Sequence, residues 1–356
     1  MSQTLHDKAL AYHQEGRPGK INVSSHKKLD NDQDLSLAYS PGVAAPVREI
    51  VKDPSAVNKY TIKGNLVAVI TDGSAVLGLG NVGPLAAKPV MEGKAVLFKR
   101  FAGIDVFNIE LDTQDVDEIV NTIKNIAPTF GGINLEDISA PRCFEIEKRL
   151  IDELDIPVFH DDQHGTAIIV AAGLLNALEI QEKNFKEAKI VCAGAGSAGI
   201  ATLNLLLELG FSKDNILLVD RNGVVSTKSE NLSKEKLAFA ADTDKKTLSD
   251  AIDGADVFIG VARGNLVTQE MVKSMAKRPI IFALSNPDPE ISPVDVYACR
   301  DDVLMATGRS DYPNQVNNVL GFPYIFRGAL DANSKIINTE MKVAAVHALK
   351  DLVKLP

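Results

Sequence analysis

The sequence predicts an α/β protein of two units, the second of which is a doubly wound parallel sheet. Short apolar runs separated by glycine and proline recur through the first half of the chain, and apolar runs alternate with helical patterns through the second half. A glycine-rich segment directly follows one of these runs. Because alternating strands and helices pack best around a parallel sheet, the second half favours the doubly wound arrangement. The chain of 356 residues is long enough to bury two cores.

The first unit is predicted to cover residues 1–160. Residues 1–30 are polar and helix-prone, and we expect them to form an arm or an oligomer contact, with a surface loop as the alternative. Short apolar runs at residues 66–70, 95–98 and 105–109 are typical of buried strands. Helical spacing of Val116, Ile119, Val120 and Ile123 predicts a helix over residues 116–126.

The second unit is predicted to cover residues 161–356. Residues 166–180 are apolar nearly all round, which indicates a buried helix bridging the two units. Five strands and four helices are then expected in alternation. The strands are predicted at residues 189–192, 215–220, 256–260, 279–283 and 303–307, and the helices at 200–209, 247–252, 268–275 and 341–353.

The segment from Gly194 to Gly199 follows the strand at 189–192 and opens a helix, as a dinucleotide-binding loop does. Gly194 permits the tight turn, Gly196 lets the backbone approach a pyrophosphate, and Gly199 allows close packing of helix and strand. Ala195, Ser197 and Ala198 complete the loop. The pattern predicts a Rossmann-type domain that binds NAD or NADP.

The residues about twenty positions further on leave the choice of cofactor open. Asp220 ends the next predicted strand, where an acid binds the free ribose 2′-hydroxyl of NAD. Arg221 follows immediately and could hold the 2′-phosphate of NADP instead. The two neighbours favour different cofactors.

Two pairs of acidic residues, Glu136-Asp137 and Asp161-Asp162, stand at the ends of apolar, β-rich runs. Adjacent carboxylates repel one another, so burying four of them together is costly unless a cation compensates. Oxygen ligands suit Mg²⁺ or Mn²⁺ better than zinc. We therefore expect a hard divalent metal beside the nicotinamide cofactor. His160 and His164 flank the second pair, and structural roles suit them better than zinc ligation, because no HExxH motif or thiol accompanies them.

Composition excludes several other classes of function. The formal net charge of −9 argues against a nucleic-acid partner. No apolar run has the length of a membrane span, and the N-terminus lacks a secretory apolar region. Three widely spaced cysteines offer neither a zinc site nor a disulfide framework. We expect a cytoplasmic protein.

Several long segments, taken in order, resemble the malic enzymes. They are AYSPGVA, TDGSAVLGLGNVGPLAAKPVMEGK, GGINLEDI, FHDDQHGTA, ALSNP and GRSDYPNQVNNV. The resemblance runs from about Gly19 to the C-terminal helix. The sequences of these segments are most similar to the catalytic domain of bacterial NADP-dependent hybrid malic enzymes. It implies oxidative decarboxylation of L-malate to pyruvate and CO₂, with NADP expected rather than NAD.

The resemblance also implies roles for individual residues. Glu136, Asp137 and Asp162 match the metal carboxylates, Lys94 matches the general base, and Tyr39 matches the acid that protonates the enolate. The lowered pKa that a lysine base needs is expected of Lys94, and Asp161 is expected either to tune Lys94 or to orient the metal ligands. Asn286, which is also expected at the cofactor, and one or both of Asn317 and Asn318 match the amides that hold the substrate carboxylate.

The chain departs from the larger members of the family at one point. They carry an arginine that clamps malate shortly after an Asp-Gly pair, and this chain has Ser74-Ala75 after Asp72-Gly73. Hybrid enzymes also carry a C-terminal domain resembling phosphate acetyltransferase, so a chain ending at Pro356 is expected to be a short enzyme or the catalytic part of a longer one. The resemblance implies a homodimer or a larger homo-oligomer, and leaves open which subunit supplies Tyr39.

Two other functions compete with a malic enzyme. A metal-free dehydrogenase related to the amino-acid dehydrogenases would keep its activity in EDTA, and the four acids count against it. A non-catalytic nucleotide sensor would be expected to have lost Tyr39, Lys94 or a carboxylate, and all are present. Lys88 competes with Lys94 for the role of base, and the family pattern favours the lysine after Glu-Gly.

Overall fold

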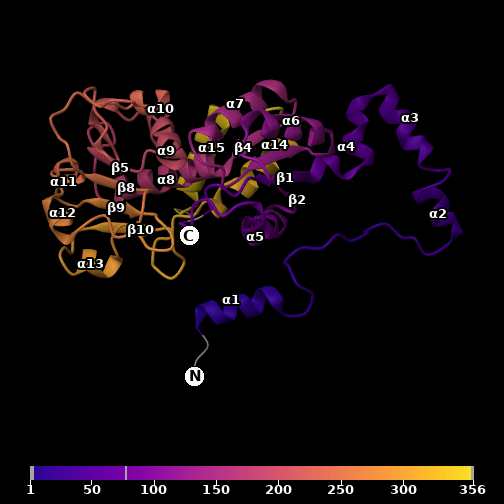
Figure 1. Cartoon of the computed structure of the whole chain (residues 1–356), viewed down its shortest axis with the longest axis horizontal. Helices are drawn as coiled ribbons and strands as arrows, with labels where there is room; N and C mark the ends of the chain where they lie inside the picture. Colours follow the sequence, from indigo (N-terminus) through magenta and orange to yellow (C-terminus); the bar gives the residue numbers. More distant parts are fainter. Residues whose placement is uncertain (1–3, 77, 354–356) are drawn as a thin grey trace.

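Residues 4–76 and 78–353 are described by a computed structural model of the chain (Figure 1). Its first sheet is parallel and has the strand order β2-β1-β3-β4. These strands are β1 (Leu66–Thr71), β2 (Asp105–Glu110), β3 (Gly132–Leu135) and β4 (Val158–His160). All six residues of β1 are buried, which explains its continuous apolar sequence.

Helices cover both faces of this sheet because alternate side chains of β1 enter different cores. Leu66, Ala68 and Ile70 pack in one core with α6 (Val116–Ile126) and α7 (Arg142–Glu153). Val67 and Val69 lie in the other core with α5 (Pro84–Ala102).

The second sheet has the strand order β10-β9-β8-β5-β6-β7. It is parallel except for β7, which pairs antiparallel with β6 at the edge. Its strands are β5 (Ile190–Ala193), β6 (Ile216–Asp220), β7 (Gly223–Val224), β8 (Val257–Gly260), β9 (Ile280–Ala283) and β10 (Leu304–Thr307). Strand order reverses at β5, and in open parallel sheets such a point is where ligands bind.

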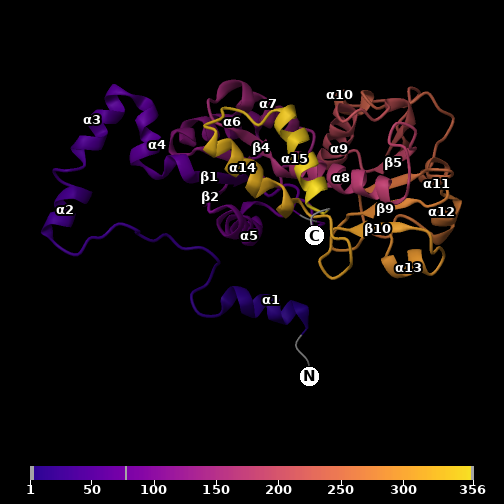
Figure 2. The same ribbon diagram turned by 180° about the vertical axis from the view of Figure 1, so that it is seen from behind.

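One hydrophobic core joins the two sheets. It contains Val67 of the first sheet and Ile259 of the second, together with apolar residues of α8 (Asp161–Ile180). In Figure 2, α14 (Phe322–Asp331) and α15 (Thr339–Leu352) lie over this region; α14 packs on α5, and α15 packs on α8. The predicted bridging helix is therefore present and begins five residues earlier than expected, directly after β4.

The N-terminal part of the chain forms an arm, which we define as residues 4–60. It contains α1 (Leu5–Gln14), α2 (Asp32–Ala38), α3 (Ala44–Lys52) and α4 (Val57–Tyr60), and none of these helices contains a buried residue. Figures 1 and 2 show α2 and α3 far from both sheets. The arm is thus longer than the predicted 30 residues.

Helix α9 (Ser197–Glu208) packs on α8. The remaining elements are short, and they are η1 (Pro54–Ala56), η2 (Ile62–Asn65), η3 (Ala127–Thr129), η4 (Lys213–Asn215), α10 (Lys234–Leu237), α11 (Leu248–Ile252), α12 (Gln269–Ser274), α13 (Pro293–Tyr297) and η5 (Asn318–Leu320).

The predicted α/β class and the doubly wound second sheet are confirmed, and the predicted strand at residues 95–98 is wrong. That run lies inside α5, whose buried residues Ala87, Met91, Ala95 and Phe98 recur at helical spacing. A four-residue apolar run has no period of its own, so only the longer pattern separates helix from strand. Among the described residues, no helix is long and apolar enough to cross a membrane.

Candidate active site and metal centre

The carboxyl ends of β3 and β4 deliver the two acidic pairs to one edge of the first sheet. Glu136 and Asp137 follow β3, and Asp161 and Asp162 form the first turn of α8 directly after β4. Because β3 and β4 are parallel neighbours, their ends meet at the same edge. The predicted meeting of the four acids is therefore present in the structure.

Three of these acids form a candidate metal-ligand group. One carboxylate oxygen from each of Glu136, Asp137 and Asp162 lies within 4.8 Å of the others. Asp137 adopts a left-handed backbone, with φ of 54°, and its amide donates to Asp162 Oδ2 at 2.7 Å. An all-oxygen group of this kind fits Mg²⁺ or Mn²⁺, and neither His160 nor His164 belongs to it.

The electrostatics of the chain alone show why a cation suits this place. Burial raises the pKa of Glu136, and the nearby Asp162 carboxylate raises it further despite the opposing effect of Lys94. Burial likewise raises the pKa of Asp162 above its usual range. Carboxyls with raised pKa values gain most from a positive charge placed between them.

Lys94 points from α5 into the acidic group. Its Nζ lies 2.6 Å from Asp161 Oδ2 and 2.9 Å from Glu136 Oε1, and it sits over the ring of Phe322 at 4.2 Å. Burial lowers the pKa of Lys94, but these two carboxylates raise it by more, so the net shift is upward. The expected fall in the Lys94 pKa is therefore wrong for the chain by itself, because the acids that surround the lysine hold its proton.

Lys88, the competing lysine, lies elsewhere. Its Nζ is 3.1 Å from Glu110 Oε2, and its side chain is 47% exposed. More than one and a half turns of α5 separate the two lysines, which places them on different faces of the helix. Only Lys94 reaches the metal-ligand group.

Asp161 is fully buried and links the lysine to the second unit. Its Oδ2 accepts from Lys94 and also from Asn318 Nδ2, in each case at 2.6 Å. One turn along α8, Gly165 leaves room for this side chain, because a Cβ there would lie 1.7 Å from Asp161 Oδ1. Burial raises the pKa of Asp161 to about 7.

Tyr39 is not brought to this site. It lies at the C-terminal end of α2 in the arm and is 71% exposed. Within one chain, Tyr39 therefore does not join Lys94 and the acids, because the segment that carries it extends away from both sheets (Figure 1).

The glycine loop has the geometry that its sequence predicts. Gly194 has φ of 120°, and a Cβ on Gly199 would lie 1.8 Å from Gly194 O, so helix and strand pack closely here. A Cβ on Gly196 would meet nothing within 4 Å, which leaves the loop open where a pyrophosphate approaches. Helix α9 begins at Ser197, and its N-terminus carries the positive end of the helix dipole.

Two cavities lie on either side of this loop. One, of about 350 Å³, joins Asp137 and Asp162 to Ser197 and Ala198; Asn286, Asn317 and Asn318 also line it. The other, of about 820 Å³, is lined by Gly194, Ala195, Asp220 and Arg221. A dinucleotide across the loop would thus have one end beside the acids and the other beside Asp220.

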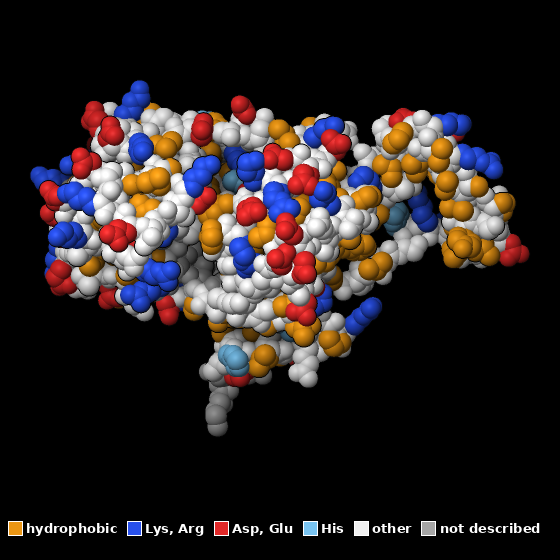
Figure 3. All heavy atoms as spheres, turned by 45° about the horizontal axis from the view of Figure 1, so that its top comes forward, with side chains coloured by type: hydrophobic (Ala, Val, Ile, Leu, Met, Phe, Trp, Pro, Cys, Tyr) orange, Lys and Arg blue, Asp and Glu red, His pale blue; other side chains and the backbone are white. Residues whose placement is uncertain are grey.

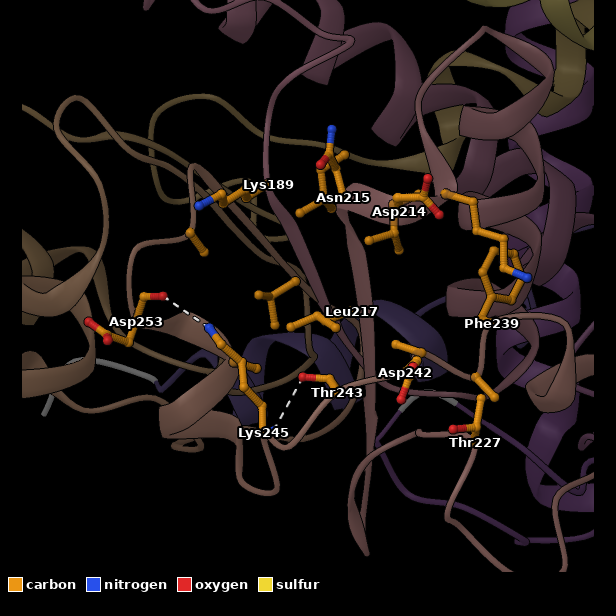
Figure 4. A pocket seen from close by; sticks show the side chains of 18 residues that line it. Lys189, Asp214, Asn215, Leu217, Thr227, Phe239, Asp242, Thr243, Lys245 and Asp253 are labelled. Carbon is orange, nitrogen blue, oxygen red and sulfur yellow. Dashed lines mark hydrogen bonds between the residues drawn. The ribbon is translucent and has the colours of Figure 1, made fainter.

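A third cavity, of about 560 Å³, lies at the amino ends of β5 and β6, away from the glycine loop. Figure 4 shows it between Lys189, Leu217 and Lys245, with Lys245 Nζ donating to the carbonyl of Asp253 at 3.2 Å. None of the residues that line it is a predicted site residue.

Ser74 and Ala75, where the chain departs from the family pattern, have different surroundings. Ala75 lines the smaller cavity, whereas Ser74 is buried against Arg142, whose Nη2 donates to Ser74 Oγ at 3.0 Å. Arg142 also pairs with Asp72 at 2.9 Å. Arg142 therefore supports the loop from behind, and no lysine or arginine is among the described residues that line the smaller cavity.

Behind the acids, sequence reasoning missed a buried glutamate. Glu147 of α7 accepts from the His160 amide at 2.8 Å and from Gln163 Nε2 at 3.1 Å, and it lies 3.0 Å from His164 Nε2. Lys342 Nζ, which can only donate, lies 3.1 Å from His164 Nδ1, so Nε2 carries the His164 proton. Glu147 stands in no motif, and only its position on the buried face of α7 could have indicated it.

The smaller cavity joins the dinucleotide loop to Asp137 and Asp162 of the metal-ligand group, and the buried Lys94 contacts the third member, Glu136. In agreement with this pairing, sequence models of the malic enzyme N-terminal domain and the malic enzyme NAD-binding domain match residues 18–151 and 163–355. The chain belongs to the malic enzyme family. The resemblance predicted from the sequence is thereby confirmed.

Individual malic enzymes are similar over the whole chain. The NADP-dependent malic enzyme of Halomonas elongata is 58% identical over 100% of this chain and 84% of its own length. The NADP-dependent malic enzyme of Rhizobium meliloti is 57% identical over 99% of this chain, which spans 47% of that relative. The crystal structure of malic enzyme from Pyrococcus horikoshii has a TM-score of 0.93 and 45% identity, covering 99% of this chain and 84% of that one.

Proposed function

We propose that this chain catalyses the oxidative decarboxylation of L-malate to pyruvate and CO₂, with reduction of NADP⁺ and dependence on Mg²⁺ or Mn²⁺. The observation that carries the proposal is the cavity of about 350 Å³ that joins Asp137 and Asp162 to the start of α9. Few reactions of a small hydroxy acid need both a hard cation and a hydride acceptor. Residues 1–160 and 161–356 are proposed as the two domains between which the site is shared.

In this proposal Glu136, Asp137 and Asp162 hold the divalent cation, which supplies Lewis-acid polarisation of the substrate oxygen atoms. Lys94 accepts the proton of the malate C2 hydroxyl as hydride leaves for the nicotinamide. Lys94 acts as base in its neutral amine form, and Asp161 orients its amino group through the 2.6 Å contact and is itself held by Asn318. A cation bound to Glu136 would take up negative charge that otherwise holds the Lys94 proton.

Substrate carboxylates are proposed to bind through amides and not through a guanidinium. The smaller cavity is lined by Asn286, Asn317 and Asn318, and its described lining residues include no cationic side chain. Asn317 also caps the turn that follows it, because its Oδ1 accepts from the Val319 amide at 3.0 Å. That contact fixes the rotamer of a side chain at the cavity wall.

Tyr39 is proposed to act in the site of a second copy of the chain, which makes the working enzyme a homodimer or larger homo-oligomer. Tyr39 is 71% exposed, and α1, α2 and α3 bury no residue against their own chain. Exposed apolar side chains of the arm include Leu37, Val47 and Val51, and Figure 3 shows hydrophobic side chains gathered on it. An arm with this surface is suited to packing on another copy.

The test follows absorbance at 340 nm with L-malate and Mn²⁺, first with NADP⁺ and then with NAD⁺. Reduction that requires malate, stops in EDTA and yields pyruvate is the expected result. Reduction that continues in EDTA would support a metal-free dehydrogenase, and oxaloacetate as the product would contradict the decarboxylation step. The chain spans about half the length of several curated relatives. The assay therefore uses residues 1–356 alone, so that any activity belongs to this part of the sequence.

A further inference from the structure

We propose that Arg142 is a positioning residue for the metal centre, because it holds the loop that fixes the backbone of Asp137. The inference rests on the proposed function for the role of Asp137 as a metal ligand. It goes beyond that function by assigning part of the metal affinity to an arginine. This side chain cannot itself be a ligand of a cation, and it lies outside the described lining of the smaller cavity.

Asp137 offers its carboxylate from a backbone that residues other than glycine adopt only rarely. Its φ of 54° lies in the left-handed region, which persists where surrounding contacts hold it. Two hydrogen bonds with the loop at residues 72–75 supply such contacts. The Ala75 amide donates to the Asp137 carbonyl at 2.9 Å, and the Ser139 amide donates to Ser74 Oγ at 2.9 Å. The loop therefore fixes the chain directly after the Asp137 Cα.

Arg142, the first residue of α7, holds this loop and the segment at residues 137–139 together. Its Nη1 donates to Asp72 Oδ2 at 2.9 Å, and its Nη2 donates to Ser74 Oγ and to Ser139 Oγ, each at 3.0 Å. Asp72 is only 1% exposed and accepts from the Ser74 hydroxyl at 2.5 Å. One guanidinium thus joins the loop to the segment that carries the ligand.

The charge of Arg142 and its role in positioning would have opposite effects on a bound cation. A guanidinium repels a divalent cation, so its removal would tighten metal binding if charge were its only effect. Removing Arg142 together with its partner Asp72 leaves the net charge of the region unchanged. Loss of support for the loop would instead weaken metal binding, because Asp137 would leave its ligand geometry. The sign of the change therefore separates the two effects.

Binding of Mn²⁺ to the full chain, followed by electron paramagnetic resonance without malate or cofactor, tests the inference. For Arg142→Gln we expect the Mn²⁺ dissociation constant to rise about 10-fold, as for partners outside the ligand shell. The double variant Asp72→Asn/Arg142→Gln should show a similar rise, although it removes one charge of each sign. Isothermal titration should find the NADP⁺ affinity of both within about 2-fold of the unaltered chain, because the glycine loop belongs to the second sheet.

Two further variants sharpen the result. Arg149→Gln is the matched control, because it makes the same change about two turns along α7, where Arg149 pairs with the exposed Asp117. It should leave Mn²⁺ affinity unchanged. Ser74→Ala removes the acceptor of the Ser139 amide and should weaken Mn²⁺ binding to a similar degree. Combining it with Arg142→Gln should add little, because both changes act through the same contact.

Urea unfolding distinguishes positioning from a purely structural role. Arg142→Gln by itself leaves the buried Asp72 carboxylate without its cationic partner, so it should unfold at a lower urea concentration. The double variant removes that unpaired charge and should recover part of the stability. Recovered stability with Mn²⁺ binding still weak is the result expected of a positioning residue. If Arg142→Gln does not fold, the double variant and Ser74→Ala decide the question.

Unchanged or tighter Mn²⁺ binding in the double variant would overturn the inference, and so would an equal loss of Mn²⁺ and NADP⁺ affinity. Either result would leave the malate reaction standing, because neither measurement involves turnover. Failure of the unaltered chain to bind Mn²⁺ would count against the proposed function itself.

Discussion

At the scale of single residues, the site depends on groups whose charges balance only as a set. Lys94, Glu136 and Asp161 are buried, and Lys94 Nζ lies within 3 Å of both carboxylates. The lysine and the two acids therefore shift one another's pKa values. The acids could be found in the sequence because they stand in pairs after apolar runs. The sign of the Lys94 shift could not, because it depends on distances that no sequence pattern gives.

Asp162→Asn should weaken the metal site. It removes a negative charge and one of three carboxylate ligands, so Mn²⁺ affinity should fall by more than the roughly 10- to 100-fold typical of partners outside the ligand shell. Mn²⁺ binding followed by electron paramagnetic resonance measures this. Asp152→Asn is the control, since Asp152 is an exposed residue paired only with Lys148. Unchanged Mn²⁺ affinity in Asp162→Asn would remove Asp162 from the ligand set.

Glu147→Gln should destabilise the fold without touching the ligands. Three donors converge on the Glu147 carboxylate. A glutamine would place its own NH₂ donor next to at least one of these donors, so one hydrogen bond would be lost. We expect a loss of about 3 kcal/mol at neutral pH, measured by urea unfolding. Glu145→Gln, an exposed change on the same helix, should cost almost nothing.

The same residue predicts a pH dependence. Burial raises the pKa of Glu147, but His164, His160 and Lys342 lower it by more, so the net pKa falls from the ordinary 4.5 to about 2. A lowered pKa contributes stability that is complete above pH 4.5 and is lost as the pH falls towards 2. The difference in unfolding free energy between the unaltered chain and Glu147→Gln should therefore narrow over that interval. A constant difference would show that the charge of Glu147 plays no part.

At the scale of elements, α8 matters most because it carries site residues at its start and core residues along its length. Its helical pattern predicted residues 166–180, whereas Asp161 and Asp162 were interpreted only as site residues. Both descriptions hold, since Asp162 is a ligand candidate and Asp161 contacts Lys94, and the two residues also form the first helical turn. Helix α5 shows the opposite case: Lys94 could be chosen from its motif, but its neighbours at 95–98 were assigned to a strand.

Glycines of α8 allow a sharp test of this element. Gly165→Ala should displace Asp161, because the new Cβ would lie 1.7 Å from its Oδ1, and misplacement on that scale can cost about 100-fold in kcat. Gly173→Ala is the matched control in the same helix, where the nearest atom is a Phe282 ring carbon at 3.4 Å. It should keep its activity and gain up to about 1 kcal/mol in stability. Equal activity of the two variants would show that Asp161 tolerates movement.

At the scale of the whole molecule, the arm is the part that the sequence predicted least well. Its polar composition predicted a contact for residues 1–30, and the structure extends the arm through α4. Tyr39 was assigned by its motif, but its distance from the acids could not be derived from the sequence. The helices of the arm contain no buried residue, so their sequences carry no pattern of core contacts to interpret. The second sheet, by contrast, followed from strands such as β5, β8 and β9, whose apolar runs are continuous, whereas one of the runs predicted as strands in the first unit is helical.

Mixing two inactive variants tests the role of the arm. If Tyr39 acts in a second copy, co-expressed Tyr39→Phe and Lys94→Ala chains should regain activity, because a mixed dimer then contains one site with both residues intact. With random pairing, about a quarter of the unaltered activity is expected. If each chain uses its own Tyr39, every site in the mixture is defective, and the activity stays at the level of the separate variants.

The core shared by both sheets has a consequence for how the molecule responds to its ligands. Val67, Ile259 and α8 lie in one cluster, so moving the two sheets apart would expose apolar side chains to water. A nucleotide that tightens the second sheet therefore also tightens the first, and amides of β1 should exchange their hydrogens more slowly when only the cofactor is present. We therefore expect substrate to enter and leave through the mouth of the cavity, without exposure of this core.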